Sequence, residues 1–472
     1  MDKRARVLAS VETRKASLIA LSDAVWGFAE TGFEELKSAE ALSQALAAEG
    51  FEVQMGLAGI GTAFVASYGS GGPVVALLGE YDALPALSQR AASPVQEELV
   101  PGGSGHGCGH NLLGVGSLGA ALAVRDYLRD SGLPGTVKYF GCPGEEHGCG
   151  KTYMAREGCF DGVDLALTWH PADVNCVLQA RTLANLSMYF RFSGRAAHAA
   201  GSPHLGRSAL DAVELMNVGA NYLREHVIPE ARIHYSITNP GGRAPNVVQA
   251  EAESFYFCRA PRVAQARDVY DRLCEVARGA AMMTGTTVEI RFAEGLSDYI
   301  PNRTAGALLQ RCLEEVGAPA FDEADRELGD RFRKTLGAAE IGSSLAQARL
   351  FQGAATAKVL ESSTLAGVVG PLFSGDACLP GSTDVGDVSQ IVPTGQAVLA
   401  CTALGTGPHT WQFTAQAASS IGHQGMLAAA RVLALACIEV FLDPGIAQLA
   451  KAELLEAASG AYVCPIPPEI HP

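Results

Sequence analysis

The hydrophobic pattern of this chain changes twice, near residues 183 and 297, and this division constrains its fold more than any other feature. In the first part, short apolar runs typical of strands alternate with longer runs typical of helices, such as VVALLGEYD (74–82) and NLLGVGSLGAALAVRDYLRDSG (111–132). Strands that alternate with helices favour parallel pairing, because the helix returns the chain to the starting edge of the sheet. The predicted fold class is therefore α/β, with a mixed, largely parallel sheet that carries helices on both faces.

The segment between the two changes follows another order. LANLSMYFRFSG (183–194) alternates like a half-exposed strand, and further strand and helix patterns follow it at 204–226, 232–239, 251–260, 263–283 and 287–295. The order β-α-β-β-α-β predicts a four-stranded sheet with two helices, a smaller α+β domain inserted into the first one. We therefore divide the chain into a first part of the catalytic domain (1–182), an inserted lid or dimerisation domain (183–296) and a second part of the catalytic domain (297–472).

Turn residues and periodicity predict the remaining elements. Two helices are expected within 12–49, the second with Ser38 as its N-cap and Gly50 at its end. Further strands are expected at 51–55, 61–69, 135–146, 163–171 and 397–404, and a closing helix at 424–442. The small-residue section GAAEIGSSLAQARLFQGAATAKV (337–359) has no placement from its pattern.

Composition narrows the class of partner. The 472 residues are 48% hydrophobic and 18% charged, and the formal net charge is −15. Phosphate surfaces attract basic faces, so we expect no nucleic-acid or membrane partner and small molecules instead. The N-terminus lacks an uninterrupted apolar core, and no later run reaches the roughly 18 apolar residues of a spanning helix. With twelve cysteines in no disulfide-framework spacing, we expect reduced thiols and a cytoplasmic location.

A short set of polar side chains falls just after a predicted strand or in a strand-to-helix hinge. The set comprises Asp82, Cys108, His110, Glu145, Glu146, His170 and His409. Ligands of open α/β sheets collect beyond the carboxyl ends of the strands, so these distant segments are predicted to converge.

Their chemistry is that of a metal centre. Histidine nitrogens, a thiolate and a carboxylate are too many donors for one closed tetrahedral site, and they suit two adjacent divalent ions with open positions. Such donors fit zinc, manganese, cobalt or nickel. Neighbouring side chains in an extended segment point to different sides, so we assign Glu146 as a ligand and Glu145 as the general base that moves the proton of the attacking water.

Eight motifs in order carry a resemblance to a known family. They are GEYDALP, GHGCGHNLLG, PGEEHG, WHP, SGRAAHAAGSPHLGRSALDAV, NVVQAEA, GSTDVGDVS and GPHTWQF. Together they resemble the M20 metallopeptidases of the aminoacylase and carboxypeptidase group, over nearly the whole chain. The resemblance implies a catalytic domain interrupted by a lid, a dinuclear metal centre, and hydrolysis of an amide bond of an N-acylated amino acid.

The resemblance also implies roles for the residues of the metal centre. Glu145 matches the family's base, and the matched metal ligands are Cys108, His110, Glu146, His170 and His409. Cys108 stands where many relatives have a bridging aspartate, which makes it a candidate bridge. Asp82 matches a carboxylate that orients one of the ligands. The strand before it ends in LLGEYD, where simpler relatives carry an arginine and an aspartate, so their finer substrate preferences do not transfer.

Three lid residues also match family positions. His198, in AAHAAG, matches a histidine that reaches into the neighbouring active site of a dimer and supports the oxyanion. Asn246 and Arg259 match positions that bind the carboxylate of the substrate, for which a guanidinium fork is suited. Plainer interpretations stand beside these: His198 also suits an ordinary turn, and Arg259 a solvated strand end. Asp384, in a glycine-rich loop, is a turn former as readily as a pocket residue.

The first functional hypothesis is a dinuclear amidohydrolase of an aroyl or heteroaryl conjugate of an acidic amino acid, such as an aminobenzoyl-glutamate-like compound. A second keeps the metals but changes the bond, so that the enzyme deaminates an amino-substituted ring or cleaves a small dipeptide. A third is a chain that is inactive without a homologous partner. The expected assembly is a homodimer or a heteromer with a homologous chain, formed through the lid.

Overall fold

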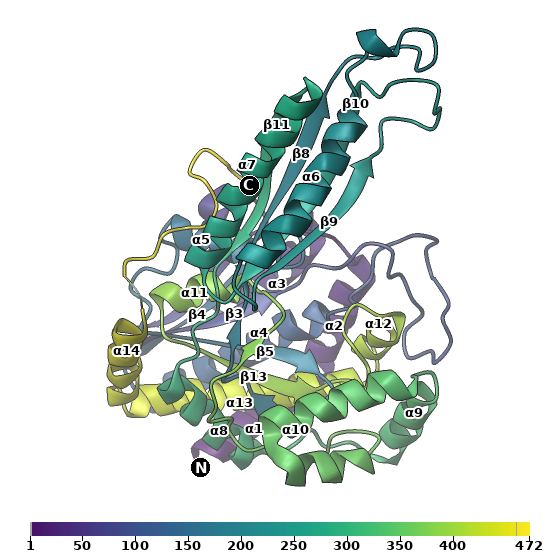
Figure 1. The fold of residues 1–472 in the computed structure, drawn as a ribbon. Coiled ribbons are helices and arrows are strands. Elements are labelled where there is room, and N and C mark those ends of the chain that lie inside the picture. Colours follow the sequence, from purple (N-terminus) through teal and green to yellow (C-terminus); the bar gives the residue numbers. More distant parts are fainter. Residues whose placement is uncertain (1, 459) are drawn as a thin grey trace.

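The computed structural model describes residues 2–458 and 460–472, which form a body and a lid that projects from it (Figure 1). The body contains a seven-stranded sheet and the lid a four-stranded one. A third, two-stranded sheet pairs β7 (Arg181–Thr182) with β12 (Cys378–Leu379) where the chain passes between body and lid.

The body sheet has the strand order β1-β2-β4-β3-β5-β13-β6. Its bounds are β1 Glu52–Met55, β2 Phe64–Ser70, β3 Val74–Glu80, β4 Gly135–Cys142, β5 Leu165–Ala172, β6 Cys176–Val177 and β13 Thr394–Ala400. The central strands β4, β3, β5 and β13 pair in parallel, and the strands at both edges pair antiparallel. The predicted mixed, largely parallel sheet is confirmed. All four central strands therefore end at one edge, where the polar side chains are expected.

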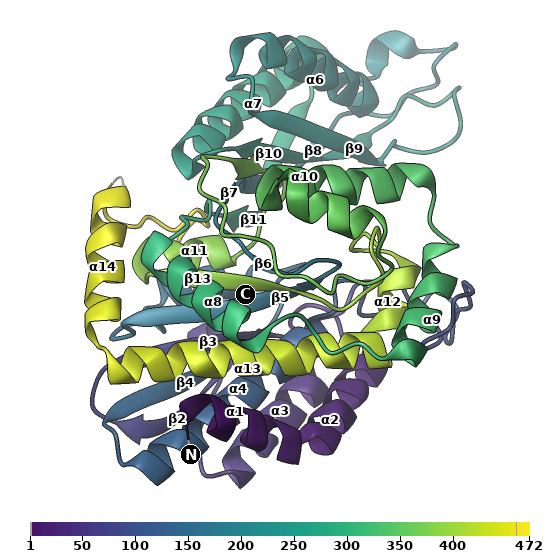
Figure 2. The same ribbon diagram turned by 90° about the horizontal axis from the view of Figure 1, so that it is seen from below.

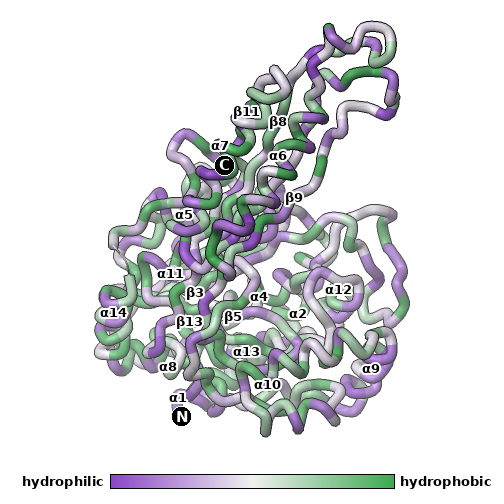
Figure 3. Tube along the Cα trace, in the orientation of Figure 1, coloured by the Kyte–Doolittle hydropathy of each residue, from purple (hydrophilic) through white to green (hydrophobic). Residues whose placement is uncertain are grey.

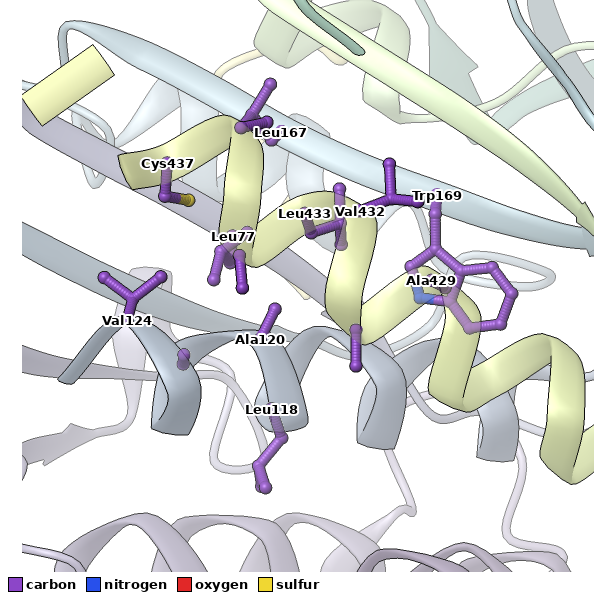
Figure 4. Close-up of a cluster of buried hydrophobic side chains, with 14 of the residues drawn as sticks. Leu77, Leu118, Ala120, Val124, Leu167, Trp169, Ala429, Val432, Leu433 and Cys437 are labelled. Carbon is purple, nitrogen blue, oxygen red and sulfur yellow. The ribbon is translucent and has the colours of Figure 1, made fainter. Parts of the chain in front are cut away.

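Alternating side chains bury both faces of this sheet. One face packs on α4 (His110–Ser131) and α13 (Ser420–Leu442), and Figure 4 shows Leu77 and Trp169 against residues of these helices. The opposite face, which includes Leu78, packs on α5 (Gly150–Arg156) and α11 (Val385–Ile391). Full burial of one large apolar side chain stabilises the fold by about 1.5–3 kcal/mol. Because both faces of the sheet are covered in this way, the helices that carry site residues are held firmly against the sheet.

The closing helix α13 corrects one sequence expectation. By length and composition it could cross a membrane, with a mean hydropathy of 2.0 over its most apolar window. In the fold 83% of that window is buried, and the helix lies in the interior of the body (Figures 2 and 3). The expectation that no run is long and apolar enough for a spanning helix is therefore wrong, because a fully enclosed core helix has the same composition.

Three helices precede the first strand: α1 Lys3–Thr13, α2 Lys15–Phe28 and α3 Leu36–Ala48. The pattern predicted the last two and missed α1. It also placed the start of α3 wrongly, because Ser38 lies inside the helix rather than at its N-cap. The Glu30 carboxylate accepts from the backbone N–H groups of Lys37 and Ser38, so a residue outside the helix satisfies its first turn.

The second part of the body is mainly helical. Its remaining helices are α8 Arg303–Val316, α9 Glu323–Arg333, α10 Ala338–Glu361, α12 Trp411–Ala417 and α14 Gly445–Ala457. The unplaced small-residue section forms α10, which Gly353 interrupts with a non-helical backbone (φ 84°, ψ 163°). Only glycine adopts this conformation readily, so the break divides the hydrophobic pattern of one long helix.

The lid has the predicted order of elements. They are β8 Ala184–Ser193, α6 Ala209–Leu223, β9 Arg232–Asn239, β10 Glu251–Ala260, α7 Val263–Thr284 and β11 Thr287–Leu296. The antiparallel sheet has the order β11-β8-β10-β9, which leaves β9 as an edge strand. All of these elements lie within the range predicted for the lid, 183–296. The loops at the far end of the lid project away from the body (Figure 1).

Candidate metal centre

The carboxyl ends of the central strands gather the polar side chains at one edge of the body sheet. Asp82 follows β3, Glu145 and Glu146 follow β4, and His170 lies near the end of β5. Two further segments reach this edge: the start of α4 brings Cys108 and His110, and the loop after β13 brings His409.

Five of these residues form two groups of metal-type donors. Ligand atoms of Cys108, His110 and His170 lie within 4.8 Å of one another, and so do those of Cys108, Glu146 and His409. Cys108 belongs to both groups. Its Sγ lies 3.4 Å from His170 Nε2, and His409 Nε2 lies 3.1 Å from Glu146 Oε1. A shared donor between two groups is the arrangement of two neighbouring ions with a bridging ligand.

The glycines around Cys108 allow its approach to the sheet. Gly109 is the N-cap of α4, in the left-handed region at φ 76°. A Cβ on Gly109 would lie 2.8 Å from Phe413 Cε1 and 2.9 Å from Pro171 Cγ. A side chain here would therefore push α4 away from His170 on β5 and from α12, where Phe413 lies. This close contact explains a glycine hinge before a helix whose first residue is a donor.

Asp82 holds two elements of the centre in register. Its Oδ1 lies 2.8 Å from His110 Nδ1, and its Oδ2 accepts from the backbone N–H of Glu146 at 2.8 Å. The bond to Nδ1 fixes the imidazole so that Nε2 faces the donor group. One buried carboxylate thus sets the orientation of His110 and the position of Glu146.

Two buried polar atoms test whether divalent cations fit here. His110 Nε2 and Glu146 Oε1 make no hydrogen bond of good geometry within the described parts of the chain, and their near neighbours are other candidate donors, Glu80 Oε2 at 3.3 Å and His409 Nε2 at 3.1 Å. Buried polar atoms are normally paired, so an unpaired nitrogen and oxygen that face other donors are typical of metal ligands. The mixed nitrogen, sulfur and oxygen donors suit a transition metal or zinc. The residues present therefore fit two divalent ions.

His409 is held in a strained conformation. Its φ is +60°, in the left-handed region that a histidine seldom adopts. Its backbone N–H donates to Gly107 O at 2.8 Å, which ties it to the loop that carries Cys108. Its side chain is 53% exposed, whereas that of Glu146 is 8% exposed. The centre is therefore open to solvent on the His409 side, where a substrate can enter.

Glu145 is absent from the two groups that share Cys108 and belongs to a third group of potential metal ligands, with Glu80 and His110. An oxygen of Glu145 is within 4.8 Å of ligand atoms of Glu80 and His110. Burial raises the pKa of Glu145 well above its ordinary value, and the negative charges of Glu80 and Glu146 raise it further. A raised pKa means that the carboxylate holds a proton more strongly than usual, which suits a group that accepts a proton from water and later releases it.

Two residues of this region, Glu80 and Lys151, were not found from the sequence as parts of the site, and Asp384 was considered only as a turn former or a pocket residue. Glu80 Oε2 lies 3.3 Å from His110 Nε2, and Glu80 Oε1 lies 2.8 Å from Lys151 Nζ. Lys151 is fully buried and also pairs with Asp384, whose Oδ2 accepts from the Lys151 backbone N–H at 2.9 Å. Glu80 could have been found from the segment LLGEYD, because this segment differs from the arginine and aspartate that simpler relatives carry there. Lys151 gave none, because a lysine in a short helix usually lies in solvent.

The lid residues lie outside this cluster. His198 is exposed, and its Nδ1 accepts from the backbone N–H groups of Ala200 and Gly201 at 3.2 and 3.0 Å. The Nε2 of His198 is therefore the nitrogen that remains for a ligand. Asn246 lies beside it, because its carbonyl accepts from Ala199 N at 3.0 Å. Among the contacts of the described residues, neither side chain touches the donor groups of its own chain.

Arg259 lies at the other end of the lid sheet. In β10 the first residue, Glu251, pairs with Ser193, whereas Arg259 pairs with Asn185 near the body. The Arg259 guanidinium contacts Pro380 O at 3.4 Å and Ser382 Oγ at 3.3 Å. Its Nε is buried and has no partner in the described structure. One chain therefore does not bring Asn246 and Arg259 together.

Comparisons with known proteins agree with this geometry. Residues 76–323 match the sequence profile of peptidase family M20/M25/M40. The chain is 46% identical over 468 residues to the B subunit of p-aminobenzoyl-glutamate hydrolase from Escherichia coli (strain K12), an alignment that covers 98% of this chain and 97% of that protein. The resemblance to the M20 family is thereby confirmed.

More distant relatives cover different shares of the chain. Xaa-Arg dipeptidase of Mus musculus is 29% identical, over 98% of this chain and 93% of that protein. The A subunit of the Escherichia coli hydrolase is 29% identical, over 62% of this chain and 69% of its own. A solved structure with a similar fold is the YXEP protein of Bacillus subtilis, described as a dinuclear metal-binding peptidase of family M20. It has a TM-score of 0.55 and 17% identity, and covers 91% of this chain and 99% of that one.

Proposed function

We propose that this chain, which belongs to peptidase family M20/M25/M40 and is a hydrolase of amide bonds, has a specific substrate class and cofactor. It uses two divalent ions to cleave an aromatic acyl group from an acidic amino acid. The observation that carries this proposal is the pair of donor groups that share Cys108, with Glu145 beside them. The 46% identity to one chain of a p-aminobenzoyl-glutamate hydrolase supports the substrate class. Zinc and manganese are the proposed ions, and cobalt and nickel would also suit these donors.

The protein's own residues then have separate tasks. Cys108, His110 and His170 would hold one ion, and Cys108 with Glu146 and His409 the other. Bound divalent ions supply Lewis acidity toward the scissile carbonyl and lower the pKa of water. Glu145 takes the proton of the attacking water and passes it to the leaving amide nitrogen, for which its raised pKa is suited.

The remaining steps fall to the lid. Arg259 is assigned to the carboxylate of the substrate, because its unpaired Nε and its position near the body leave a guanidinium edge for an anion. His198, through its free Nε2, is assigned to the oxyanion, and Asn246 beside it to the bound substrate. Since His198 and Asn246 lie at the far end of the lid, we assign them to the site of a neighbouring chain.

The lid also offers a surface for such a neighbour. The edge strand β9 exposes Tyr235 and Ile237, which are 39% and 43% accessible to solvent. Helix α6, which packs on the neighbouring strands β8 and β10, exposes Leu215, Val218 and Tyr222. An apolar edge strand next to an apolar helix face pairs readily with a second copy of itself or with a homologous chain. We propose assembly through β9 and α6.

A small dipeptide is the second candidate substrate, because the identity to Xaa-Arg dipeptidase extends over 98% of the chain. Deamination, and a chain that needs a homologous partner for activity, are the remaining candidates. The complete donor set and Glu145 favour activity in the chain itself. A panel of p-aminobenzoyl-glutamate, an arginine dipeptide and an aminobenzoate, read by mass spectrometry, separates the reactions, because deamination releases ammonia and no amino acid.

Two adjacent variants test the proposed mechanism. Glu145→Gln should keep both ions, measured by elemental mass spectrometry, and lower kcat by about 10²–10⁴, since it removes the acid–base group. Glu146→Gln is the matched control: it should lose one ion, because it removes a ligand and leaves the base in place. Turnover near the wild-type level in Glu145→Gln, or two tightly held ions in Glu146→Gln, would contradict the roles.

A further inference from the structure

A cavity of about 510 Å³ opens beside the metal centre, and the mechanism above makes no use of it. It lies next to His170, between α10 and the loop that carries His409. Its volume falls within the range of about 300–1,000 Å³ for small-molecule sites. One wall, α10, lies beyond the residues that match the family profile, 76–323. The cavity is therefore built partly from a segment outside that profile.

The charge of this cavity excludes the acidic end of the substrate. Among the described residues that line it, none is a lysine or arginine, whereas Asp173 and Glu340 are carboxylates. Asp173 accepts from Ser344 Oγ and from the backbone N–H of Gly405, so it is already paired inside the protein. A carboxylate of the substrate would meet two like charges and no lysine or arginine among the described lining residues, whose other polar groups are neutral amides, hydroxyls and His170, so its charge would be poorly compensated. The substrate carboxylates must lie elsewhere.

The shape and the hydrogen-bonding groups of the cavity suit an aromatic ring. Phe351 forms part of the wall and is braced edge-on by Phe373, with ring centroids 5.2 Å apart. Gln352 also lines the cavity, and it is only 3% exposed. Its Oε1 is buried against Gly370 and has no partner in the described structure, so a turn of the amide would present this acceptor to the cavity. An unpaired buried acceptor beside apolar walls favours a flat ring that carries an N–H donor.

The position of the cavity relative to the metal centre and Arg259 indicates which end of the substrate it binds. His170 lines the cavity and also belongs to a donor group, so a carbonyl attached to a ring in the cavity reaches the metal centre. Leu379 lines the cavity as well, and the next residue, Pro380, contacts Arg259. The cation of Arg259 thus stands outside the cavity, next to its Leu379 wall, where the amino-acid end of a substrate can reach it.

We infer that this cavity binds the acyl group of the substrate, an aromatic ring with an amino substituent, and that Gln352 accepts a hydrogen bond from that amino group. The inference rests on the proposed function, because it assigns the acyl end of the same substrate. It makes α10 the element that sets acyl specificity, while Arg259 binds the amino-acid carboxylate.

Two variants of the cavity test this inference by activity. Ala348→Phe fills the cavity from α10, and its matched control, Ala346→Phe, adds the same ring to an exposed position of that helix. The ratio of kcat/KM for p-aminobenzoyl-glutamate to that for N-acetyl-glutamate should fall about tenfold in Ala348→Phe alone. Gln352→Leu should reduce the preference for p-aminobenzoyl-glutamate over benzoyl-glutamate by about tenfold, the loss of one buried hydrogen bond.

A binding measurement keeps this test independent of turnover. Titration calorimetry with p-aminobenzoate should show affinity in the wild type and in Ala346→Phe, and at least tenfold weaker binding in Ala348→Phe and Gln352→Leu. Unchanged substrate ratios together with unchanged p-aminobenzoate binding would overturn the inference. If the wild type hydrolyses none of the acyl-glutamates yet binds p-aminobenzoate in a Gln352-dependent way, the proposed function fails and the binding site stands.

Discussion

A buried lysine beneath the metal centre holds two carboxylates together. Lys151 pairs with Glu80, which touches His110, and with Asp384 at the start of α11. Truncation of a buried ion pair leaves the other charge unpaired, which destabilises a protein by about 3–5 kcal/mol. Lys151→Met should therefore lower the free energy of unfolding by about that amount, measured by urea denaturation.

The double variant supplies the control for this prediction. Asp384→Asn removes one of the charges that Lys151 neutralises, so the two substitutions should be strongly non-additive when combined. The Lys151→Met, Asp384→Asn variant should be more stable than the sum of the two single effects. Simple additivity would mean that the buried pair contributes no coupling, and that Lys151 is held in place by packing alone.

A second buried carboxyl group predicts a pH dependence of stability. Glu35 Oε1 accepts from Gly144 N at 2.8 Å, beneath the loop that carries Glu145 and Glu146. Burial raises the pKa of Glu35 from 4.5 to about 8, and the charge of Asp82 adds to this. The folded state keeps a proton that the unfolded chain has released, so this contribution is present at low pH and is lost as pH rises from 4.5 to about 8.

Glu35→Gln removes this titration while it preserves the shape of the side chain. Its denaturation midpoint should fall less between pH 5 and pH 8 than that of the wild type. Glu34→Gln, at the exposed neighbouring position, is the control and should keep the wild-type slope. Identical slopes in all three proteins would contradict a protonated Glu35 in the folded state.

At the residue scale, the sequence identifies the donors better than the groups that support them. Cys108, His110 and His409 stand between glycines or at strand-to-helix hinges, where a reactive side chain is unusual enough to be noticed. Glu80 and Lys151 stand inside a strand and a helix, where burial depends on neighbours distant in sequence. A buried ion pair leaves no periodic signal, and only the folded chain brings it together.

At the scale of elements, the two glycines at the ends of α4 have the same backbone conformation but different roles. Gly109 caps its start and Gly132 its end, both in the left-handed region at φ 76° and 68°. A Cβ at Gly109 would meet Phe413 and Pro171, whereas a Cβ at Gly132 would meet nothing within 4 Å. Each substitution to alanine should therefore cost about 1–2 kcal/mol in backbone strain, but only Gly109→Ala should also displace the donors.

Metal content separates these two variants. Gly132→Ala should bind two ions per chain with wild-type affinity although its thermal midpoint falls, because it lies at the far end of the helix. Gly109→Ala should show weaker metal binding in competition with a chelator, because Cys108 and His110 flank the strained position. Equal metal affinity in both variants would indicate that α4 adjusts around Gly109 without moving its donors.

Local patterns predict elements well where each element buries one face by itself. The strand β10 begins and ends at the predicted residues, because buried and partly exposed side chains alternate along it. The strand β9 also has its predicted bounds, from the alternation of Ile233, Tyr235 and Ile237 in its sequence, although only Ile233 is buried. Two helices could not be predicted from such local patterns. The helix α1 begins with the charged residues KRAR and buries only two side chains, Val7 and Val11. The helix α10 is broken at Gly353 and rich in small residues, so its pattern has no single period.

At the scale of the whole molecule, the sequence pattern predicts the order of the domains, whereas only the family resemblance assigns His198 to a neighbouring active site. The eight motifs occur in one chain, yet the fold places His198 and Asn246 at the far end of the lid from Arg259. Strand pairing over the length of the lid sheet decides this separation, and no single motif contains it. The proposed assembly through β9 and α6 would bring His198 of one chain to the site of another.

Mixing of inactive variants tests whether His198 acts across this interface. Neither Glu145→Gln nor His198→Ala should turn over well alone, because each lacks one part of every site. In a mixed dimer, the intact Glu145 of one chain meets the intact His198 of the other, so refolding the two variants together at equal amounts should restore about a quarter of wild-type activity. Light scattering would establish that the active species contains two chains.

The control pairs Glu145→Gln with the Glu145→Gln, His198→Ala double variant, which cannot assemble a complete site in either arrangement. Activity in the first mixture and none in the control would require His198 to reach the neighbouring metal centre. If instead both mixtures stay inactive while mixed dimers form, His198 serves its own chain after closure of the lid. In that case the exposed Nε2 would have to travel the length of the lid, and locking β9 in a dimer should abolish turnover.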